Sequence, residues 1–153
     1  GHLIPEGGFD MVPQMCCDGC LLTGDAAMLC INLGYQVRGM DYAIAAGRMA
    51  AEAALEALDA GDVSAARLAT YRAKLEDSFV LKDLAAYRGF PAFMEGTPRI
   101  FDGYPQMAAD IMRGLFTVDG SPVRPLKGTV MGPVKGMGVL NLLKDARKGM
   151  KVL

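Results

Sequence analysis

The sequence predicts an α+β fold that is mostly α, with a short N-terminal region of β-hairpins followed by helices. Three patterns predict it: an Asp18-Gly19 pair between two apolar runs, an alanine-rich stretch over 41–60, and apolar residues at helical spacing after Ser64. The first pattern is typical of a hairpin with a two-residue turn, and the other two are typical of helices that bury one face.

Residues 1–24 are expected to form short strands. The turn between the last two strands favours positive φ at both Asp18 and Gly19, because a two-residue hairpin turn of the common type needs it. The apolar runs expected as strands are Leu3-Ile4, Phe9 to Val12, Met15 to Cys17 and Cys20 to Thr23.

A helix is predicted from Asp41 to Ala60. Nine of these residues are alanine, and the polar residues Arg48, Glu52, Glu56 and Asp59 recur at spacings of four, four and three. A single polar stripe implies that the other sides are buried, where alanine permits close approach of neighbouring elements. Gly61 is placed to end this helix as its C′ glycine.

The next helix is expected to begin after Ser64 as the N-cap, with Val63 and Leu68 forming a hydrophobic staple. Its apolar face continues through Leu68, Tyr71, Leu75 and Phe79, and Gly89 and Pro91 end the pattern. A further helix is predicted from about Pro105 to Phe116, closed by an Asp119-Gly120 turn. Ser121 to Gly136 is rich in Pro and Gly and is predicted to be an extended loop.

Length and composition favour one globular domain. The chain has 153 residues, of which 52% are hydrophobic, and no uninterrupted apolar run reaches the roughly 18 residues of a membrane span. Four cysteines do not make a secreted disulfide scaffold, and no signal peptide is recognised. We therefore expect a cytoplasmic protein, with peripheral attachment to the inner membrane as the alternative.

The net charge of −1 conceals an acidic body with a basic tail. Up to Gly120 there are 9 Lys/Arg against 16 Asp/Glu, and from Ser121 there are 7 Lys/Arg against Asp145 alone. An acidic body argues against nucleic-acid binding. The tail suits an anionic membrane or an acidic ferredoxin, and the alternative is a solvated helix that packs only its apolar side. Its residues are Lys144, Arg147, Lys148 and Lys151 with Val139, Leu140, Leu142, Leu143 and Met150.

No residue is assigned a catalytic role. His2 is the sole histidine and has no Ser or Cys partner in a recognisable dyad, and the glycines at 128, 132, 136 and 138 lack the ending of a phosphate-binding loop. Cys16, Cys17 and Cys20 leave a metal site or a redox-active pair as an alternative, with Cys30 as the remaining cysteine. Hairpin geometry explains their spacing, so no metal site is expected.

Gly24 and Asp25 end an apolar stretch, and the predicted alanine-rich helix begins shortly after Gly39. Glycine lets the backbone approach a ligand closely, a carboxylate accepts hydrogen bonds from ribityl hydroxyls, and a helix N-terminus offers free N–H donors. This combination suits a flavin. A strand-turn-helix corner with a capping aspartate is the simpler interpretation of the same residues.

Several motifs together resemble the electron transfer flavoprotein-quinone oxidoreductase family. The ends of the Fix-type, nitrogen-fixation-related flavoproteins resemble Leu142 to Leu153, which favours that branch. The stretch Tyr71 to Arg88 is similar to a helical segment of the same proteins. The motifs are Leu3-Ile4-Pro5-Glu6-Gly7-Gly8, Thr23-Gly24-Asp25-Ala26-Ala27, and Arg38-Gly39-Met40-Asp41-Tyr42-Ala43 with Gly47.

The resemblance implies an FAD-dependent oxidoreductase that passes electrons from an electron transfer flavoprotein to quinone or to a small ferredoxin. Asp25 would hold the ribityl chain, and the helix N-terminus would favour negative charge on the flavin by about 0.3–2 kcal/mol. The implied cofactor-binding residues are Gly24, Asp25, Gly34, Gly39, Met40 and Asp41. The implied regions are the end of an FAD-binding α/β domain (1–60), a helical segment (61–120), and a loop with a basic helix (121–153).

Two features of the family are missing, the G-x-G-x-x-G turn that holds the ADP half of FAD and the ferredoxin-like tail of the quinone oxidoreductases. The chain is therefore expected to be the C-terminal part of such a flavoprotein, inactive by itself, with exposed apolar surface that favours a homodimer. The alternatives are a geranylgeranyl-reductase-like flavoenzyme acting on polyprenyl lipids and a non-catalytic helical interaction module.

Overall fold

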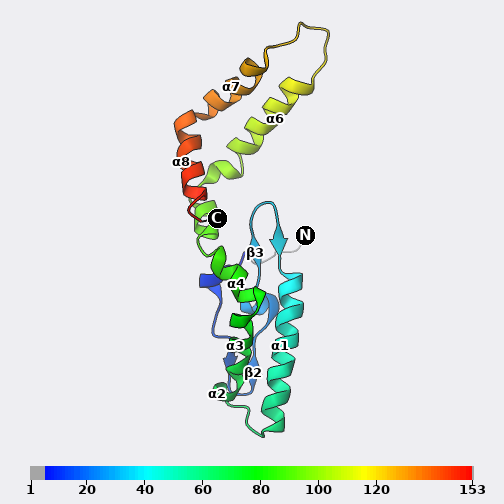
Figure 1. The fold of residues 1–153 in the computed structure, drawn as a ribbon, viewed down its shortest axis with the longest axis vertical. Helices are drawn as coiled ribbons and strands as arrows, with labels where there is room; N and C mark the ends of the chain where they lie inside the picture. The colour runs from blue at the N-terminus through cyan, green and yellow to red at the C-terminus, as the bar shows by residue number, and fades with distance from the viewer. Residues whose placement is uncertain (1–5, 153) are drawn as a thin grey trace. The chain divides into compact units, whose positions relative to one another are not determined.

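The computed structural model describes residues 6–152, and they form the expected α+β fold in which helices predominate (Figure 1). The chain divides into two compact units, the first ending at Pro91 and the second beginning at Ala92. The sheets found in the described residues are two antiparallel pairs of strands, both in the first unit. The strand expected at Leu3-Ile4 and the lone His2 lie outside the described residues.

The first hairpin consists of β1 (Cys16–Cys17) and β2 (Cys20–Leu21), joined by the predicted turn, and Cys17 pairs with Cys20. The expectation of positive φ at both turn residues is wrong. Only Gly19 has a positive φ, at +70°, and Asp18 does not. Tertiary contacts hold the turn instead. The N–H of Gly19 donates to the Val63 carbonyl at 2.8 Å, and Asp18 Oδ1 accepts from the Ala65 N–H at 2.7 Å.

The strand predicted from Phe9 to Val12 is wrong, because these residues contain a 3₁₀ turn, η1 (Phe9–Met11). The N–H of Met11 donates to the Gly8 carbonyl at 2.9 Å, which closes the turn. Arg88 forms an ion pair with Asp10 at 2.6 Å and lies over the Phe9 ring. These side-chain contacts take the place of pairing with a neighbouring strand.

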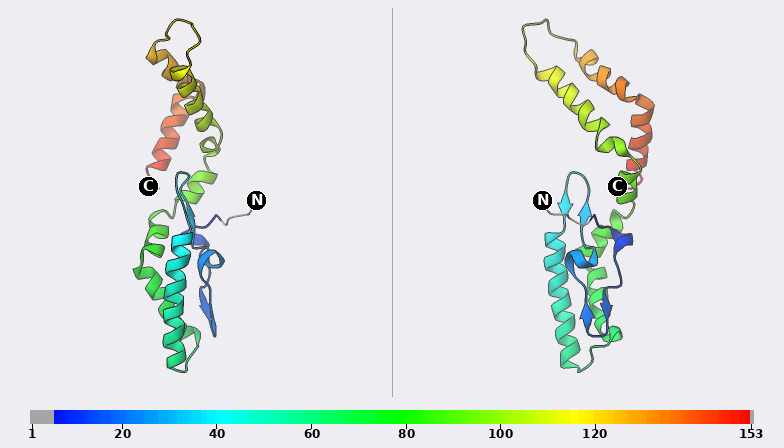
Figure 2. Two further views of the ribbon diagram at one scale, coloured as in Figure 1. Left: turned by 90° about the vertical axis from the view of Figure 1, so that its right-hand side faces the viewer. Right: turned by 180° about the vertical axis from the view of Figure 1, so that it is seen from behind.

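Helix α1 (Met40–Asp59) confirms the alanine-rich helix. Contacts with α3 (Thr70–Asp77) and with the 3₁₀ turn η2 (Gly24–Ala27) cover one of its faces, and Figure 2 shows it beside the later helices of the first unit. Gly61 ends the helix as predicted, with φ at +64°. The face that α1 buries consists of Tyr42, Ala46, Ala50, Ala53 and Ala57.

The segment after Ser64 forms three short helices, α2 (Ala65–Leu68), α3 and α4 (Phe79–Ala86). Ser64 is the predicted N-cap, because its Oγ accepts from the Arg67 N–H at 3.3 Å. The prediction of one continuous apolar face through Phe79 is wrong. Ser78 interrupts it by ending α3 and capping α4, so Val80, Leu81 and Leu84 are buried while Phe79 is 45% exposed.

The second unit is helical throughout its regular elements. Helix α6 ends at Phe116 as predicted but begins two residues before Pro105. Its elements are α5 (Phe90–Glu95), which reaches back across the boundary at Pro91, η3 (Pro98–Ile100), α6 (Gly103–Phe116), α7 (Leu126–Met137) and α8 (Val139–Gly149).

The extended loop predicted for Ser121 to Gly136 is wrong from Leu126 onward, where α7 begins. Helix α7 packs against α6 at two glycines of α6. A Cβ at Gly114 would lie 2.7 Å from Thr129 Cγ2, and a Cβ at Gly103 would lie 2.6 Å from Met137 Cε. This close approach of two helices stabilises a helix whose Gly and Pro content disfavours it locally.

A buried carboxylate on α8 links this helix to η3 and α6. Asp145 accepts from Arg99 Nε at 2.8 Å and from the Tyr104 hydroxyl at 2.6 Å. These bonds hold the pKa of Asp145 below its usual range, Arg99 having the larger effect. Among residues 6–152 no helix combines the length and the hydropathy that crossing a bilayer requires.

Candidate functional site

The strongest candidate site is the place where η2 meets the first turn of α1, which we call the α1 corner and define as Gly24, Asp25, Gly39 and Met40. Gly24 is buried with φ at +59°, and a Cβ there would lie 3.3 Å from the Ala43 Cβ. Glycine is therefore required for η2 to pack on the helix. Asp25 follows it and is exposed.

The Asp25 carboxylate faces the amino end of α1. Its Oδ1 lies 3.9 Å from the position of a Cβ on Gly39, the N-cap residue. Gly39 has no side chain to cap the helix, and within the described residues no other acceptor is found for the N–H groups of Met40 and Asp41. An exposed carboxylate and free N–H donors thus lie side by side, able to accept from hydroxyls and to donate to carbonyl or anionic oxygens.

Asp41 belongs to a different set of contacts from those of the α1 corner. Its carboxylate pairs with Arg38, at the end of β4 (Val37–Arg38), at 2.6 Å, and Arg38 also pairs with Asp83 of α4. The guanidinium lies 4.5 Å from the centre of the Tyr42 ring. Of the Asp41 groups, only the backbone N–H is placed to contribute to the α1 corner.

This Arg38 cluster fixes the start of α1. Tyr42 is fully buried and its hydroxyl donates to Asp83 at 3.1 Å; burial raises the pKa of the phenol, and the Asp83 charge raises it further. The hydrogen bond to Asp41 raises the pKa of Arg38. Sequence reasoning missed the link to Asp83, since no local pattern indicates a contact between residues so far apart.

Gly34 lies outside the α1 corner. It is in the turn between β3 (Ile31–Asn32) and β4, with φ at +80°, and its N–H donates to Asn32 Oδ1 at 2.8 Å. The strand pairing Ile31 to Arg38 places this turn about 10 Å along the hairpin from Arg38, at roughly 3.3 Å per residue. The structure gives Gly34 a turn-forming role.

Gly7 is a tightly packed residue that the sequence analysis quoted without assigning it a role. A Cβ there would lie 2.6 Å from both Cys30 Sγ and the Met28 carbonyl oxygen, so only glycine fits. Burial raises the pKa of the Cys30 thiol, and the Gly7 backbone partly offsets the rise. The segment connecting η2 to β3 is thereby held under the α1 corner.

The cysteines of the first hairpin are separate from the α1 corner. Cys16 is half-buried, whereas Cys17 and Cys20 are exposed. Within residues 6–152 no three His, Cys, Asp or Glu side chains gather as a metal site would require.

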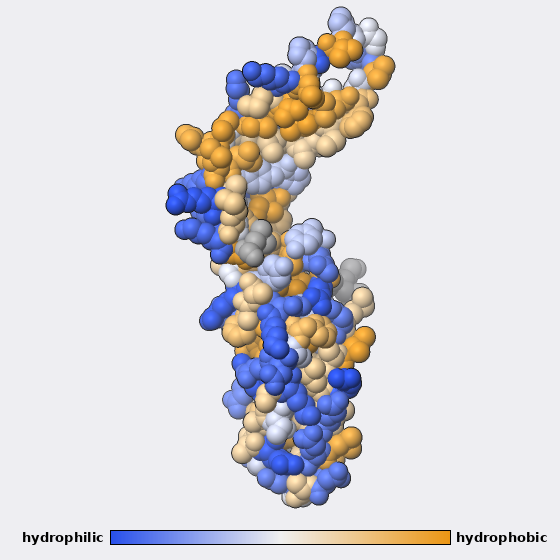
Figure 3. All heavy atoms as spheres, viewed as in Figure 1, coloured by the Kyte–Doolittle hydropathy of each residue, from blue (hydrophilic) through white to orange (hydrophobic). Residues whose placement is uncertain are grey.

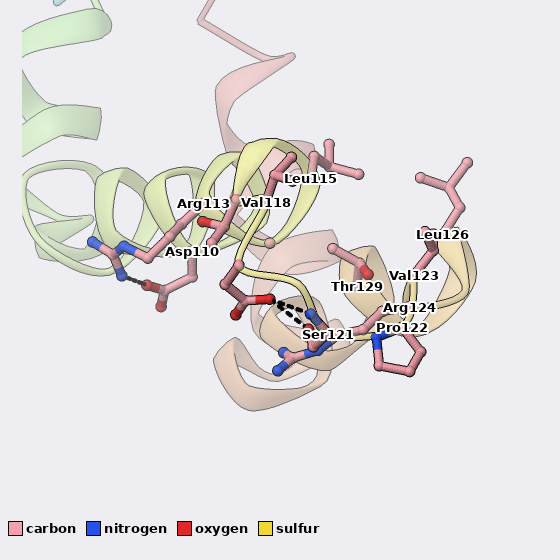
Figure 4. Close-up of a pocket in the computed structure, with 13 residues that line it drawn as sticks. Asp110, Arg113, Leu115, Val118, Ser121, Pro122, Val123, Arg124, Leu126 and Thr129 are labelled. Carbon is pink, nitrogen blue, oxygen red and sulfur yellow. Dashed lines mark hydrogen bonds and ion pairs between the residues drawn. The ribbon is translucent and has the colours of Figure 1, made fainter.

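The second unit has an open hollow of about 570 Å³ between the ends of α6 and α7 (Figure 4). Its polar contacts are internal: Arg113 pairs with Asp110 at 3.0 Å, and Asp119 accepts from the Ser121 hydroxyl at 2.6 Å. Val123 and Leu126 project outward in the close-up, and Val123 is 98% exposed. Charged and apolar side chains share the lining of this hollow, which includes Arg124 as well as the two pairs just named.

Helix α8 has an outward face that is both basic and apolar. Leu140, Leu143 and Met150 are exposed, while Asp145 and Gly149 make the buried contacts. The exposed basic residues of this helix and its end are Lys144, Arg147, Lys148 and Lys151.

Comparisons with known proteins place these features in context. The sequence profile of the ETF-QO/FixC family C-terminal domain matches residues 90–153. The probable electron transfer flavoprotein-quinone oxidoreductase YdiS of Escherichia coli K12 is 48% identical over 152 residues, which is 99% of this chain and 35% of the relative. Protein FixC of the same strain is 45% identical with the same coverage.

Protein FixC of Azorhizobium caulinodans is 38% identical over 148 residues, which is 95% of this chain and 34% of the relative. The chain therefore spans about a third of the length of the curated relatives it matches.

Proposed function

The chain belongs to the ETF-QO/FixC family, and from this we propose that it is part of an FAD-dependent oxidoreductase that passes electrons from an electron transfer flavoprotein to quinone or to a small ferredoxin. The name of one relative, the probable electron transfer flavoprotein-quinone oxidoreductase YdiS, supports the electron-transfer chemistry. Because the chain spans about a third of their length, the activity is proposed for the longer protein and not for this stretch alone.

The α1 corner carries the proposal. FAD, when bound, would supply the electron-accepting and electron-donating chemistry. Asp25 would accept a hydrogen bond from a ribityl hydroxyl, and the N–H groups of Met40 and Asp41 would donate to oxygens at one edge of the ring. The fit rests on the exposed carboxylate beside an uncapped helix end, and on Gly39, whose lack of a side chain leaves the backbone there accessible.

The positive end of α1 gives the α1 corner an electrostatic role. A helix N-terminus stabilises nearby negative charge by about 0.3–2 kcal/mol. The Arg38 cluster orients this end, because Arg38 immediately precedes Gly39 and is held by Asp41 and Asp83. Gly34 would act through the shape of its hairpin. Residues 1–60, which contain these groups except Asp83, would complete the FAD-binding domain of the longer protein.

Peripheral membrane contact is proposed for the second unit. Figure 3 shows apolar surface along the α6–α7 hairpin. Phe116, Val118 and Val123 are at least 77% exposed there, and α8 supplies basic residues. Apolar side chains with neighbouring Lys and Arg favour an anionic lipid surface, where quinone is dissolved. The basic face of α8 also suits an acidic ferredoxin.

Flavin retention tests the proposal in the full-length protein. Asp25→Ala should lower the ratio of flavin absorbance to protein absorbance after purification, whereas the matched control Asp62→Ala should retain the wild-type ratio. Asp62 is an exposed aspartate in the same unit whose carboxylate is hydrogen-bonded to Ser64. Equal flavin content in both variants would refute the role of Asp25.

A further inference from the structure

We propose that Cys17 and Cys20 form a dithiol that exchanges with small disulfides such as oxidised glutathione and closes to an intramolecular disulfide. The inference is independent of the flavin proposal. Its basis is that the two residues are direct partners across the first hairpin and that both are exposed.

The geometry of the strand pair matches that of a disulfide. Directly opposed residues of an antiparallel pair have Cα atoms about 4.5–5.5 Å apart, which lies within the roughly 4.4–6.8 Å that disulfides span. Side chains of opposed residues project from the same face of the sheet. Cys16 pairs with Leu21 and alternates to the other face, so its thiol is directed away from the pair.

The turn between the two cysteines is already ordered. Gly19 supplies the positive φ, and the contacts of Asp18 with Ala65 and of Gly19 with Val63 fix the ends of the turn. Closing the disulfide therefore needs side-chain rotation with little change in the backbone. Partial desolvation raises the pKa of Cys17, and the charge of Cys20 raises it further.

The chemistry balances in two exchanges. A thiolate of the pair attacks one sulfur of oxidised glutathione, forming a mixed disulfide and releasing one glutathione thiolate, which takes up the proton that the cysteine lost. The other cysteine then attacks the protein sulfur of that mixed disulfide and releases the second glutathione. The protein loses two electrons and two protons, and oxidised glutathione becomes two molecules of the reduced form.

Either cysteine of the pair can make the first attack as its thiolate, and the other then resolves the mixed disulfide. Cys30 is buried against Gly7 and is expected to take no part.

Intact-mass spectrometry after incubation with oxidised glutathione tests the proposal in the full-length protein. The first basic residue of the chain is Arg38, so trypsin leaves all four cysteines on one peptide and variants must assign the pair. Wild type and the control Cys16→Ser should both lose the mass of two hydrogens, with closed protein exceeding the glutathione adduct at least roughly tenfold. Cys17→Ser and Cys20→Ser should instead accumulate the adduct.

The outcomes that overturn the proposal are equally specific. They are a wild-type protein that stops at the glutathione adduct, one that remains fully reduced, or a Cys16→Ser variant that no longer closes. The wild-type measurement distinguishes closure from adduct without any variant, and the variants then assign the closed pair.

Discussion

The Oδ1 atom of Asp25 lies 3.9 Å from the position that a Cβ on Gly39 would occupy. A whole hairpin separates these two residues in the sequence. A methyl group at Gly39 has room there, since its nearest neighbour, Cys30 Cβ, lies at 3.4 Å. The space beside Asp25 thus accepts a small side chain at Gly39.

Substitutions at Gly39 and Gly24 are expected to affect flavin binding and protein stability differently. Gly39→Ala should change the free energy of unfolding by less than about 1 kcal/mol but reduce flavin retention, because the methyl group enters the space between Asp25 and the helix end. Gly24→Ala should cost about 1–2 kcal/mol of stability, because φ there is +59°. Urea unfolding and flavin absorbance measured on both variants check this. Unchanged flavin content in Gly39→Ala would count against the site.

The packing of α6 on α7 makes opposite predictions for two glycines. Gly114→Ala should destabilise the second unit by about 1–3 kcal/mol, because its Cβ would lie 2.7 Å from Thr129. Gly132→Ala should stabilise by up to about 1 kcal/mol, because nothing lies near its Cβ and alanine favours the helix. Urea denaturation measures both changes. The same sign for both variants would contradict the described packing.

The buried Asp145 predicts a dependence of stability on acid pH. The pKa of Asp145 is lower in the folded protein than the usual value of about 3.9. Its contribution to the free energy of unfolding is therefore complete above about pH 3.9 and is lost as the pH falls through the lower pKa of the folded state. Asp145→Asn should therefore be less stable than wild type near neutral pH, with a difference that narrows below about pH 4. Unfolding measured from pH 7 to pH 3 gives the comparison. A difference independent of pH would show that the Asp145 charge is not the cause.

Vesicle flotation tests the membrane contact of α8. Replacing Lys144 and Lys148 by Gln should weaken binding to vesicles rich in anionic lipid by about 30-fold, at roughly 1 kcal/mol for each lysine. The control Arg72→Gln with Lys82→Gln removes the same charge from the first unit and should leave binding unchanged. Equal losses in both double variants would indicate a nonspecific effect of net charge. Binding that persists at high salt would exclude an electrostatic role for α8.

Local rules predicted the elements whose signals lie within a few residues. The alanine helix with its end at Gly61, the Ser64 cap and the Asp18-Gly19 turn all follow from short patterns of this kind. The proximity of Asp25 to the helix start was also expected, from a Gly-Asp pair at the end of an apolar stretch and a helix N-terminus, although a hairpin lies between them.

Contacts between distant residues decided the elements that local rules missed. Helix α7 forms because glycines of α6 accept Thr129 and Met137, although four glycines and Pro133 in and just after the segment favour a loop. The 3₁₀ turn at Phe9 depends on Arg88, and the orientation of Asp41 depends on Arg38 and Asp83. No local sequence pattern within these segments indicates which distant residue each one contacts.

A crystal structure of the FAD-loaded full-length protein tests the central claim most directly. The proposal predicts a flavin ring oxygen about 2.9 Å from the backbone nitrogen of Met40 or Asp41, with a ribityl hydroxyl within hydrogen-bond distance of Asp25. A flavin bound elsewhere, with Asp25 and the first turn of α1 in contact only with water, would contradict it.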